Sequence, residues 1–231
     1  MDTVNAGLVE PAAPDLERWF WAGRWLLILM VPLAYPLAMV LPVTWGWENG
    51  VFEDSQVVVL LAGLVVALMA FRRLPRPVAM MGLFAAPFWF MAAARELSWG
   101  AVFLTPLEIT GNGPVFSSRM LWYKAAVHPT LALLLALALF VLVRFRIDRL
   151  IVTVWRNKRF PWVELGLIVL GALASTVAEG HLHIEALQLD LSAARQEVFE
   201  ELMELVAYSA LFLAQLRVLH ALGCRTVRDR L

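Results

Sequence analysis

The chain has 231 residues, of which 61% are hydrophobic and 16% are charged, and its 19 basic side chains balance its 19 acidic ones. Soluble domains average about 45–50% apolar and about 25% charged residues, so this composition predicts a membrane protein. The single cysteine and the zero net charge exclude a disulfide scaffold and a basic nucleic-acid-binding protein, and the apolar content excludes a disordered chain.

Six apolar runs are long enough to form helices that cross a membrane, which takes roughly 20 residues each. The expected spans are Trp25–Val43, Gln56–Phe71, Pro77–Ala94, Ala125–Val143, Trp162–Ala178 and Phe199–Leu222. The second run is short, so its helix is expected to begin in the preceding loop near Phe52. The sequence therefore predicts an all-α fold, a polytopic membrane helix bundle with about six transmembrane helices.

The whole chain, residues 1–231, is expected to form a single integral membrane domain. Residues 1–23 are the N-terminal cytoplasmic or interfacial segment of this domain, residues 24–222 are its bundle, and residues 223–231 are a basic cytoplasmic tail. The N-terminal segment lacks the basic start and apolar core of a cleavable signal peptide, so the first span is expected to insert uncleaved.

Basic residues gather in alternate loops, which lie on one side of the membrane. They are Arg72, Arg73 and Arg76 after the second span, Arg144, Arg146, Arg149, Arg156, Lys158 and Arg159 after the fourth, and Arg225, Arg228 and Arg230 after the sixth. By the positive-inside rule this side is cytoplasmic, which predicts a bacterial inner-membrane protein with both termini in the cytoplasm. The segment 144–159 is expected to continue the fourth span and then lie on the anionic inner leaflet. We interpret it as an orientation signal, which is favoured over a site for a specific lipid head group.

The opposite, outer side collects acidic and histidine side chains from every loop. The sixth span opens with four glutamates at spacings of three and four, which places them on one helix face, and Tyr208 continues that face. These glutamates are Glu197, Glu200, Glu201 and Glu204. Carboxylates in a bilayer are costly unless they pair, neutralise or bind a cation, so Glu204 is expected to have Arg95 or a metal ion as its partner. For Glu197 and Glu200 the alternative is a solvated first turn of the helix.

A candidate zinc site on this side consists of His128, His181, His183 and Glu200. Three such ligands and an open position would let Zn²⁺ activate a bound water and polarise a carbonyl or phosphoryl oxygen. The candidate catalytic carboxylates are Glu96, Glu201 and Glu204. The expected substrate is a lipid or a lipid-linked head group, and its candidate binding residues are Arg95, Glu48, Glu53, Trp99 and Tyr208. For the histidines the alternative is a structural or solvated side chain.

Two resemblances to known proteins rest on short segments. The run Glu96-Leu97-Ser98-Trp99-Gly100 resembles a Glu-x-Ser-Trp-Gly segment of bacterial multi-pass membrane proteins without an assigned activity. In those proteins it follows an acidic loop like Glu48–Glu53 and precedes a carboxylate-rich final helix. Trp47-Glu48-Asn49 with Glu53, and His128-Pro129-Thr130-Leu131, are similar to segments of the alkaline-ceramidase-like membrane hydrolases, which implies a zinc-dependent hydrolase. Those enzymes have seven spans and paired histidines on the last helix, where this chain has glutamates.

Four functions remain open from the sequence. The first is a metal-dependent hydrolase or transferase that acts on a lipid. The second is a proton-coupled transporter, in which Glu204, Glu96 and His128 form a relay. The third is a non-catalytic membrane subunit or assembly factor whose outer acidic face docks a membrane-protein partner. A haem protein is the fourth, and it would need a second axial ligand at the depth of His128.

Overall fold

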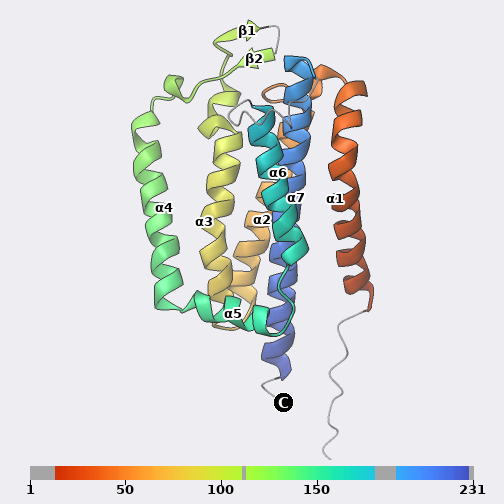
Figure 1. The fold of residues 1–231 in the computed structure, drawn as a ribbon. Helices are drawn as coiled ribbons and strands as arrows, with labels where there is room; N and C mark the ends of the chain where they lie inside the picture. Colours follow the sequence, from red (N-terminus) through yellow and green to blue (C-terminus); the bar gives the residue numbers. More distant parts are fainter. Residues whose placement is uncertain (1–13, 111–112, 180–190, 229–231) are drawn as a thin grey trace, which may run out of the picture.

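The computed structural model describes residues 14–110, 113–179 and 191–228, and it is a bundle of antiparallel helices (Figure 1). Its helices are α1 (Pro14–Val40), α2 (Val51–Arg73), α3 (Val78–Glu96), α4 (Lys124–Arg144), α5 (Ile147–Arg156), α6 (Trp162–Ala178) and α7 (Ala193–Arg228). The start of α1 and the end of α7 lie at the same end of the bundle as α5. The predicted all-α helical bundle is confirmed.

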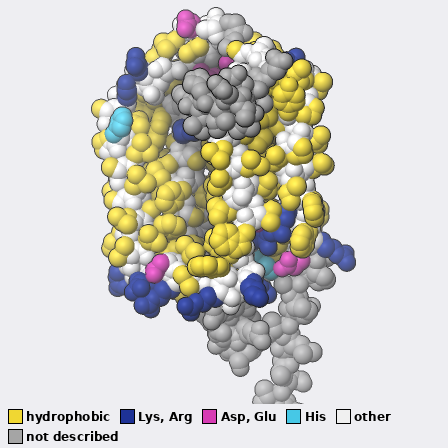
Figure 2. Space-filling view, in the orientation of Figure 1, with side chains coloured by type: hydrophobic (Ala, Val, Ile, Leu, Met, Phe, Trp, Pro, Cys, Tyr) yellow, Lys and Arg dark blue, Asp and Glu magenta, His cyan; other side chains and the backbone are white. Residues whose placement is uncertain are grey.

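Among the residues that the structure describes, five helices are long and apolar enough to cross a membrane. These segments are Leu16–Val40, Val51–Arg73, Val78–Glu96, Lys124–Arg144 and Ala193–Gly223. The remaining expected span, α6, has 17 residues. At about 1.5 Å per residue its length is about 26 Å, close to the hydrocarbon thickness of about 30 Å. Many large apolar side chains of the long helices are exposed, as lipid-facing residues would be, and Figure 2 shows them over much of the surface.

Two helices begin well before the residues that the sequence predicts. Helix α1 starts at Pro14 and not near Trp25, so the aromatic run around Phe20 is helical and not a preceding segment. Helix α7 starts at Ala193 and not at Phe199, which brings Glu197 into the helix. Both differences arise because polar residues at a helix end are excluded from a hydropathy run but still extend the hydrogen-bonded backbone.

Helix α7 is the centre of the bundle and packs against α1, α2, α3 and α6. Small residues allow the closest approaches. A Cβ atom on Gly171 of α6 would lie 2.7 Å from the carbonyl oxygen of Met203 on α7. Between α2 and α3, a Cβ atom on Gly82 would lie 2.3 Å from the carbonyl oxygen of Ala67. Such backbone contacts are typical of helix packing in membranes. Lipid is as apolar as the helices, so tight association depends on the close van der Waals packing that small residues allow.

Two short segments differ from the predicted architecture. The fourth span does not continue through residues 144–159, because Arg146 adopts a left-handed conformation with φ 52° and starts the separate helix α5. Helix α5 crosses beneath the ends of the long helices (Figure 1). At the opposite end, β1 (Glu108–Thr110) and β2 (Gly113–Val115) form an antiparallel hairpin in which Glu108 pairs with Val115.

Charge is distributed unevenly between the two ends of the bundle. On the face that Figure 2 shows, basic side chains, in dark blue, gather at the end that carries α5. This end also carries exposed tryptophans, among them Trp155 and Trp162, whose rings contact each other with centroids 6.4 Å apart. Tryptophans prefer the boundary between lipid and water, so they mark a membrane interface at this end.

A buried ion cluster links three helices near the same end. Glu164, in the first turn of α6, has no exposed surface. Its Oε1 atom accepts hydrogen bonds from Arg24 Nε of α1 at 3.1 Å and from Arg217 Nη1 of α7 at 2.6 Å. Arg24 and Arg217 are both distant from Glu164 in sequence, so these contacts connect α1, α6 and α7 in the folded bundle.

Candidate functional site

The candidate site lies at the end of the bundle that carries the hairpin, where α2, α3, α6 and α7 meet. Its carboxylates are Glu53 on α2, Glu96 on α3, Glu179 at the end of α6, and Glu200, Glu201 and Glu204 on α7. Glu201 is close enough to the carboxylates of Glu53, Glu96, Glu200 and Glu204 to be repelled by their charges. The structure therefore gathers glutamates from four helices at one depth.

Arg95 is the centre of a hydrogen-bonded network between α3 and α7. Its Nη2 atom lies 2.9 Å from Glu96 Oε1, 3.4 Å from Glu204 Oε1 and 3.1 Å from the hydroxyl of Tyr208. The Tyr208 hydroxyl also donates to Glu96 Oε1 at 2.7 Å, and Ser175 of α6 donates to Glu204 Oε1 at 3.1 Å. The Arg95 side chain is 64% exposed, whereas those of Glu96 and Glu204 are 9% and 16% exposed. Arg95 therefore brings a positive charge to the open side of the network, with the carboxylates behind it.

A second set of contacts ties α2 to α7 beside this network. The Nε2 atom of Gln56 donates to Glu201 Oε2 at 2.7 Å and to the Glu201 carbonyl oxygen at 3.0 Å. Gln56 is fully buried, and its Oε1 atom has no hydrogen-bond partner among the described residues. Glu53 accepts a hydrogen bond from the backbone N–H of Asn49, which lies just before α2. A buried acceptor without a partner is costly, so this side chain favours a further donor at the site.

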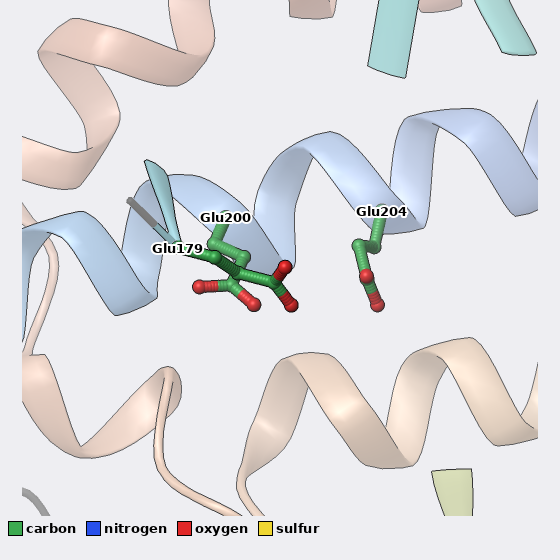
Figure 3. A group of neighbouring side chains, drawn as sticks. All are labelled: Glu179, Glu200 and Glu204. Carbon is green, nitrogen blue, oxygen red and sulfur yellow. The ribbon is translucent and has the colours of Figure 1, made fainter. Parts of the chain in front are cut away.

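Glu179, Glu200 and Glu204 could hold a metal ion together. One carboxylate oxygen from each lies within 4.8 Å of the others. Figure 3 shows Glu179 and Glu200 side by side, with Glu204 one turn further along α7 on the same side. The donors are all carboxylate oxygens, which suit hard cations such as Mg²⁺, Mn²⁺ or Ca²⁺. Zn²⁺ prefers nitrogen and sulfur ligands, so these described donors fit it less well than the expected imidazoles would.

The histidines of the expected zinc site are not part of this group. His128 is exposed on α4, which packs against α3, and it is outside the one ligand group that the described residues form. His181 and His183 lie outside the described residues. Of the expected metal ligands, Glu200 therefore lies in the group, together with Glu204, which was expected to be catalytic.

Two expected substrate-binding residues have local structural contacts. The carboxylate of Glu48 accepts a hydrogen bond from the backbone N–H of Phe116 at 2.8 Å. This bond connects the loop before α2 to the residue that directly follows β2. The carbonyl oxygen of Trp99 accepts from the hydroxyl of Tyr123 at 2.6 Å, and Trp99 has a left-handed backbone with φ 57°. Arg95 and Tyr208, by contrast, lie in the network around Glu204.

Sequence reasoning missed Ser175, Gln56 and the role of Glu179. Ser175 and Glu179 are four residues apart, so they lie on one side of the end of α6. This spacing could have predicted that α6 contributes polar side chains to the site. Gln56 could have been predicted less easily, as a polar residue one helical turn after Glu53 at the start of an apolar run.

Comparisons of the chain with protein-family models, with curated proteins and with solved structures found no match. The function is therefore argued from the residues of the site and their placement in the bundle.

Proposed function

We propose that the chain is a six-span protein of a bacterial inner membrane, with α6 as the sixth span and both termini in the cytoplasm. The unequal charge of the two ends supports this orientation, because exposed arginines and lysines are retained on the cytoplasmic side. In this orientation the carboxylate site lies at the outer face, and α5 lies on the inner leaflet.

Labelling of single cysteines tests the orientation. Cys224 is the only native cysteine, so Cys224→Ser gives a background without thiols. Glu108 and Asp148 are exposed at opposite ends of the bundle. A membrane-impermeant maleimide is expected to label Glu108→Cys in spheroplasts, and to label Asp148→Cys only after permeabilisation. The reverse pattern would contradict the proposed orientation.

We propose that the site binds a hard divalent cation and catalyses hydrolysis or group transfer at the head group of a membrane lipid. One observation carries this proposal: three glutamate oxygens converge beside an exposed arginine at one end of the bundle. Glu179 is exposed and Glu200 and Glu204 are half-buried, but Glu53 and Glu96 beside them are buried, and carboxylates gathered in this number need a compensating cation or protons. A lipid head group at the membrane surface would reach the exposed Arg95.

Each group has a role in this proposal. Glu179, Glu200 and Glu204 would hold the cation, which would supply Lewis-acid polarisation of a carbonyl or phosphoryl oxygen of the substrate. Arg95 binds the anionic part of the head group. Glu96, held by Tyr208, accepts the proton of the attacking water, and the leaving alcohol takes a proton back. With an alcohol in place of water, the same steps give a transferase. Glu201, bonded to Gln56, positions α7 against α2.

Cation binding is the direct test of the proposed site. Purified protein is expected to bind about one Mn²⁺, measured by elemental analysis and titration calorimetry. Glu200→Gln and Glu204→Gln are each expected to weaken binding at least about ten-fold, because even outer-shell changes cost about 10–100-fold in metal affinity. Glu108→Gln removes one negative charge at the same end of the bundle and is the matched control, with affinity unchanged. Equal losses of cation affinity in all three variants would mean that surface charge, and not a specific site, attracts the cation. That result, or the absence of bound cation in the purified protein, would contradict the proposal.

A proton-coupled transporter is the second candidate, and polar contacts deeper along α7 favour it. Glu201, Tyr208 and Gln215 are spaced by seven residues, and each bonds to α2 or α3. Within this row Glu201, and Glu96 as the partner of Tyr208, are carboxylates of the kind that carry protons in transporters. If this candidate is correct, the protein catalyses proton-coupled flux in liposomes, and this flux does not depend on divalent cations. Glu204→Gln is then expected to abolish the flux. A partner protein that co-purifies, without cation binding or flux, would instead favour the non-catalytic subunit.

A further inference from the structure

A cavity of about 340 Å³ lies between α3, α5 and α7, away from the carboxylate site. Its walls are formed by Phe84 and Phe88 of α3, Ile151 of α5, and Leu211 and Leu219 of α7, among other apolar residues. The cavity lies within the part of the bundle formed by apolar helices, where α5 crosses beneath α3 and α7 (Figure 1). A cavity at this depth is filled by hydrocarbon more readily than by water.

The few polar groups on its wall already have partners. Trp89 Nε1 donates to Gln215 Oε1, and Gln215 Nε2 donates to the carbonyl oxygen of Gly63 at 3.0 Å. These bonds use the single N–H of Trp89 and one of the two N–H groups of Gln215, and every other side chain that lines the cavity is apolar. The cavity therefore suits an apolar chain without functional groups.

The floor of the cavity is a strongly amphipathic helix. Ile147, Leu150, Ile151 and Val154 of α5 repeat at the i, i+3, i+4, i+7 spacing of one apolar face. Ile147 and Val154 are buried, and Ile151 lines the cavity. A short helix of this kind lies in the plane of a membrane interface.

Unpaired basic side chains surround this floor. Arg149, Arg156, Lys158 and Arg159 are all exposed, and within residues 14–110, 113–179 and 191–228 none of them forms a side-chain ion pair. The arginines of the bundle interior, Arg24 and Arg217, are by contrast paired with Glu164. Lys158 and Arg159 directly precede Phe160 and Pro161 of the cavity wall, whereas Arg149 and Arg156 lie on the face of α5 opposite Ile147, Ile151 and Val154. Positive charge therefore borders the cavity at Lys158 and Arg159.

The position of the cavity separates it from the carboxylate site. Phe88 lines the cavity, and Glu96 lies eight residues further along α3, or about 12 Å at about 1.5 Å per residue. Trp89 is the last residue of α3 that lines the cavity, and from there the cavity extends away from Glu96, to Met81 and α5. A lipid whose head group lies at the basic end would place its chain directly in the cavity.

We propose that this cavity holds an acyl chain of an anionic phospholipid, whose phosphate lies on Lys158 and Arg159, next to Phe160 and Pro161 of the cavity wall. The lipid comes from the leaflet that faces the basic end. It fills space between α3, α5 and α7 and fixes α5 at the interface. This inference does not depend on the cation site or on the proposed reaction.

Lipid retention measured by native mass spectrometry tests the head-group contact. Protein from nanodiscs of equal parts phosphatidylglycerol and phosphatidylcholine is expected to retain about one phosphatidylglycerol after delipidation. The triple variant Arg156→Gln, Lys158→Gln, Arg159→Gln is expected to lower this retention at least about ten-fold, because each basic residue near a membrane attracts anionic lipid. The matched control is Arg72→Gln, Arg73→Gln, Arg76→Gln, which removes the same charge at the same end from residues that do not line this cavity, and it is expected to retain the lipid. Equal losses in both triples, or equal retention of the two lipids, would overturn the proposal.

Filling the cavity tests the chain contact separately. Ala85 is a half-buried cavity residue of α3, and Ala136 is exposed on α4. Ala85→Phe is expected to lower phosphatidylglycerol retention about ten-fold with all basic residues intact, whereas Ala136→Phe leaves it unchanged. Unchanged retention in Ala85→Phe would show that the lipid is held by charge alone and would overturn the assignment of the cavity.

Discussion

Replacement of Glu164 by alanine is expected to destabilise the bundle by about 3–5 kcal/mol, which is the usual cost of breaking a buried ion pair from one side. The carboxylate is fully buried, and its Oε1 atom lies 3.0 Å from Arg24 Nη2 and 2.6 Å from Arg217 Nη1. Glu164→Ala leaves two largely buried guanidinium groups of α1 and α7 without their counter-ion. The loss is measured as the change in free energy of unfolding in detergent micelles, with circular dichroism as the signal.

The pair Arg146–Asp148 provides the control for this prediction. Its atoms lie 3.4 Å apart, but both side chains are 55% exposed. Asp148→Asn is expected to change the free energy of unfolding by less than about 1 kcal/mol, because water screens an exposed pair. The triple variant Arg24→Leu, Glu164→Leu, Arg217→Leu is expected to recover much of the lost stability, since it removes the stranded charges as well. If Glu164→Ala and Asp148→Asn cost the same, the ion cluster does not hold α1, α6 and α7 together.

Replacement of Gly82 by alanine is expected to cost about 1–3 kcal/mol or more, which is the usual effect of overpacking a well-packed interface. The added Cβ atom would lie 2.3 Å from the carbonyl oxygen of Ala67 and 2.8 Å from the backbone nitrogen of Phe71. Both neighbours are backbone atoms of α2, so no side chain can rotate away, and α2 and α3 must separate. The measurement is the midpoint of thermal unfolding together with the free energy of unfolding.

Gly166 of α6 is the matched control, because it is also a helical glycine. A Cβ atom there would meet no atom within 4 Å. Gly166→Ala is expected to be neutral or to stabilise the protein by up to about 1 kcal/mol, through the better helix propensity of alanine. A stabilising effect of Gly82→Ala would mean that α2 and α3 do not pack as closely as in this structure.

The sequence by itself determined where the long helices lie and which end of the bundle is basic. Apolar content over about 20 residues is a local property, and it placed α4 and α6 within a residue or two of their observed bounds. The arginines and lysines lie in alternate loops. Once the number of membrane-crossing helices is known, these loops can be assigned to one end of the bundle. The four-glutamate face of α7 followed from helical spacing alone.

Only the tertiary structure decided which of these polar groups meet. Glu164 contacts an arginine 140 residues away, and Gln56 contacts a glutamate 145 residues away. Helical periodicity gives the face of each side chain, but not the rotation of one helix against another. That rotation follows from close packing at small residues such as Gly82 and Gly171. It brought Glu179 into the carboxylate group and left His128 exposed on α4, because α4 packs at the edge of the bundle, whereas α6 lies against the central helix α7.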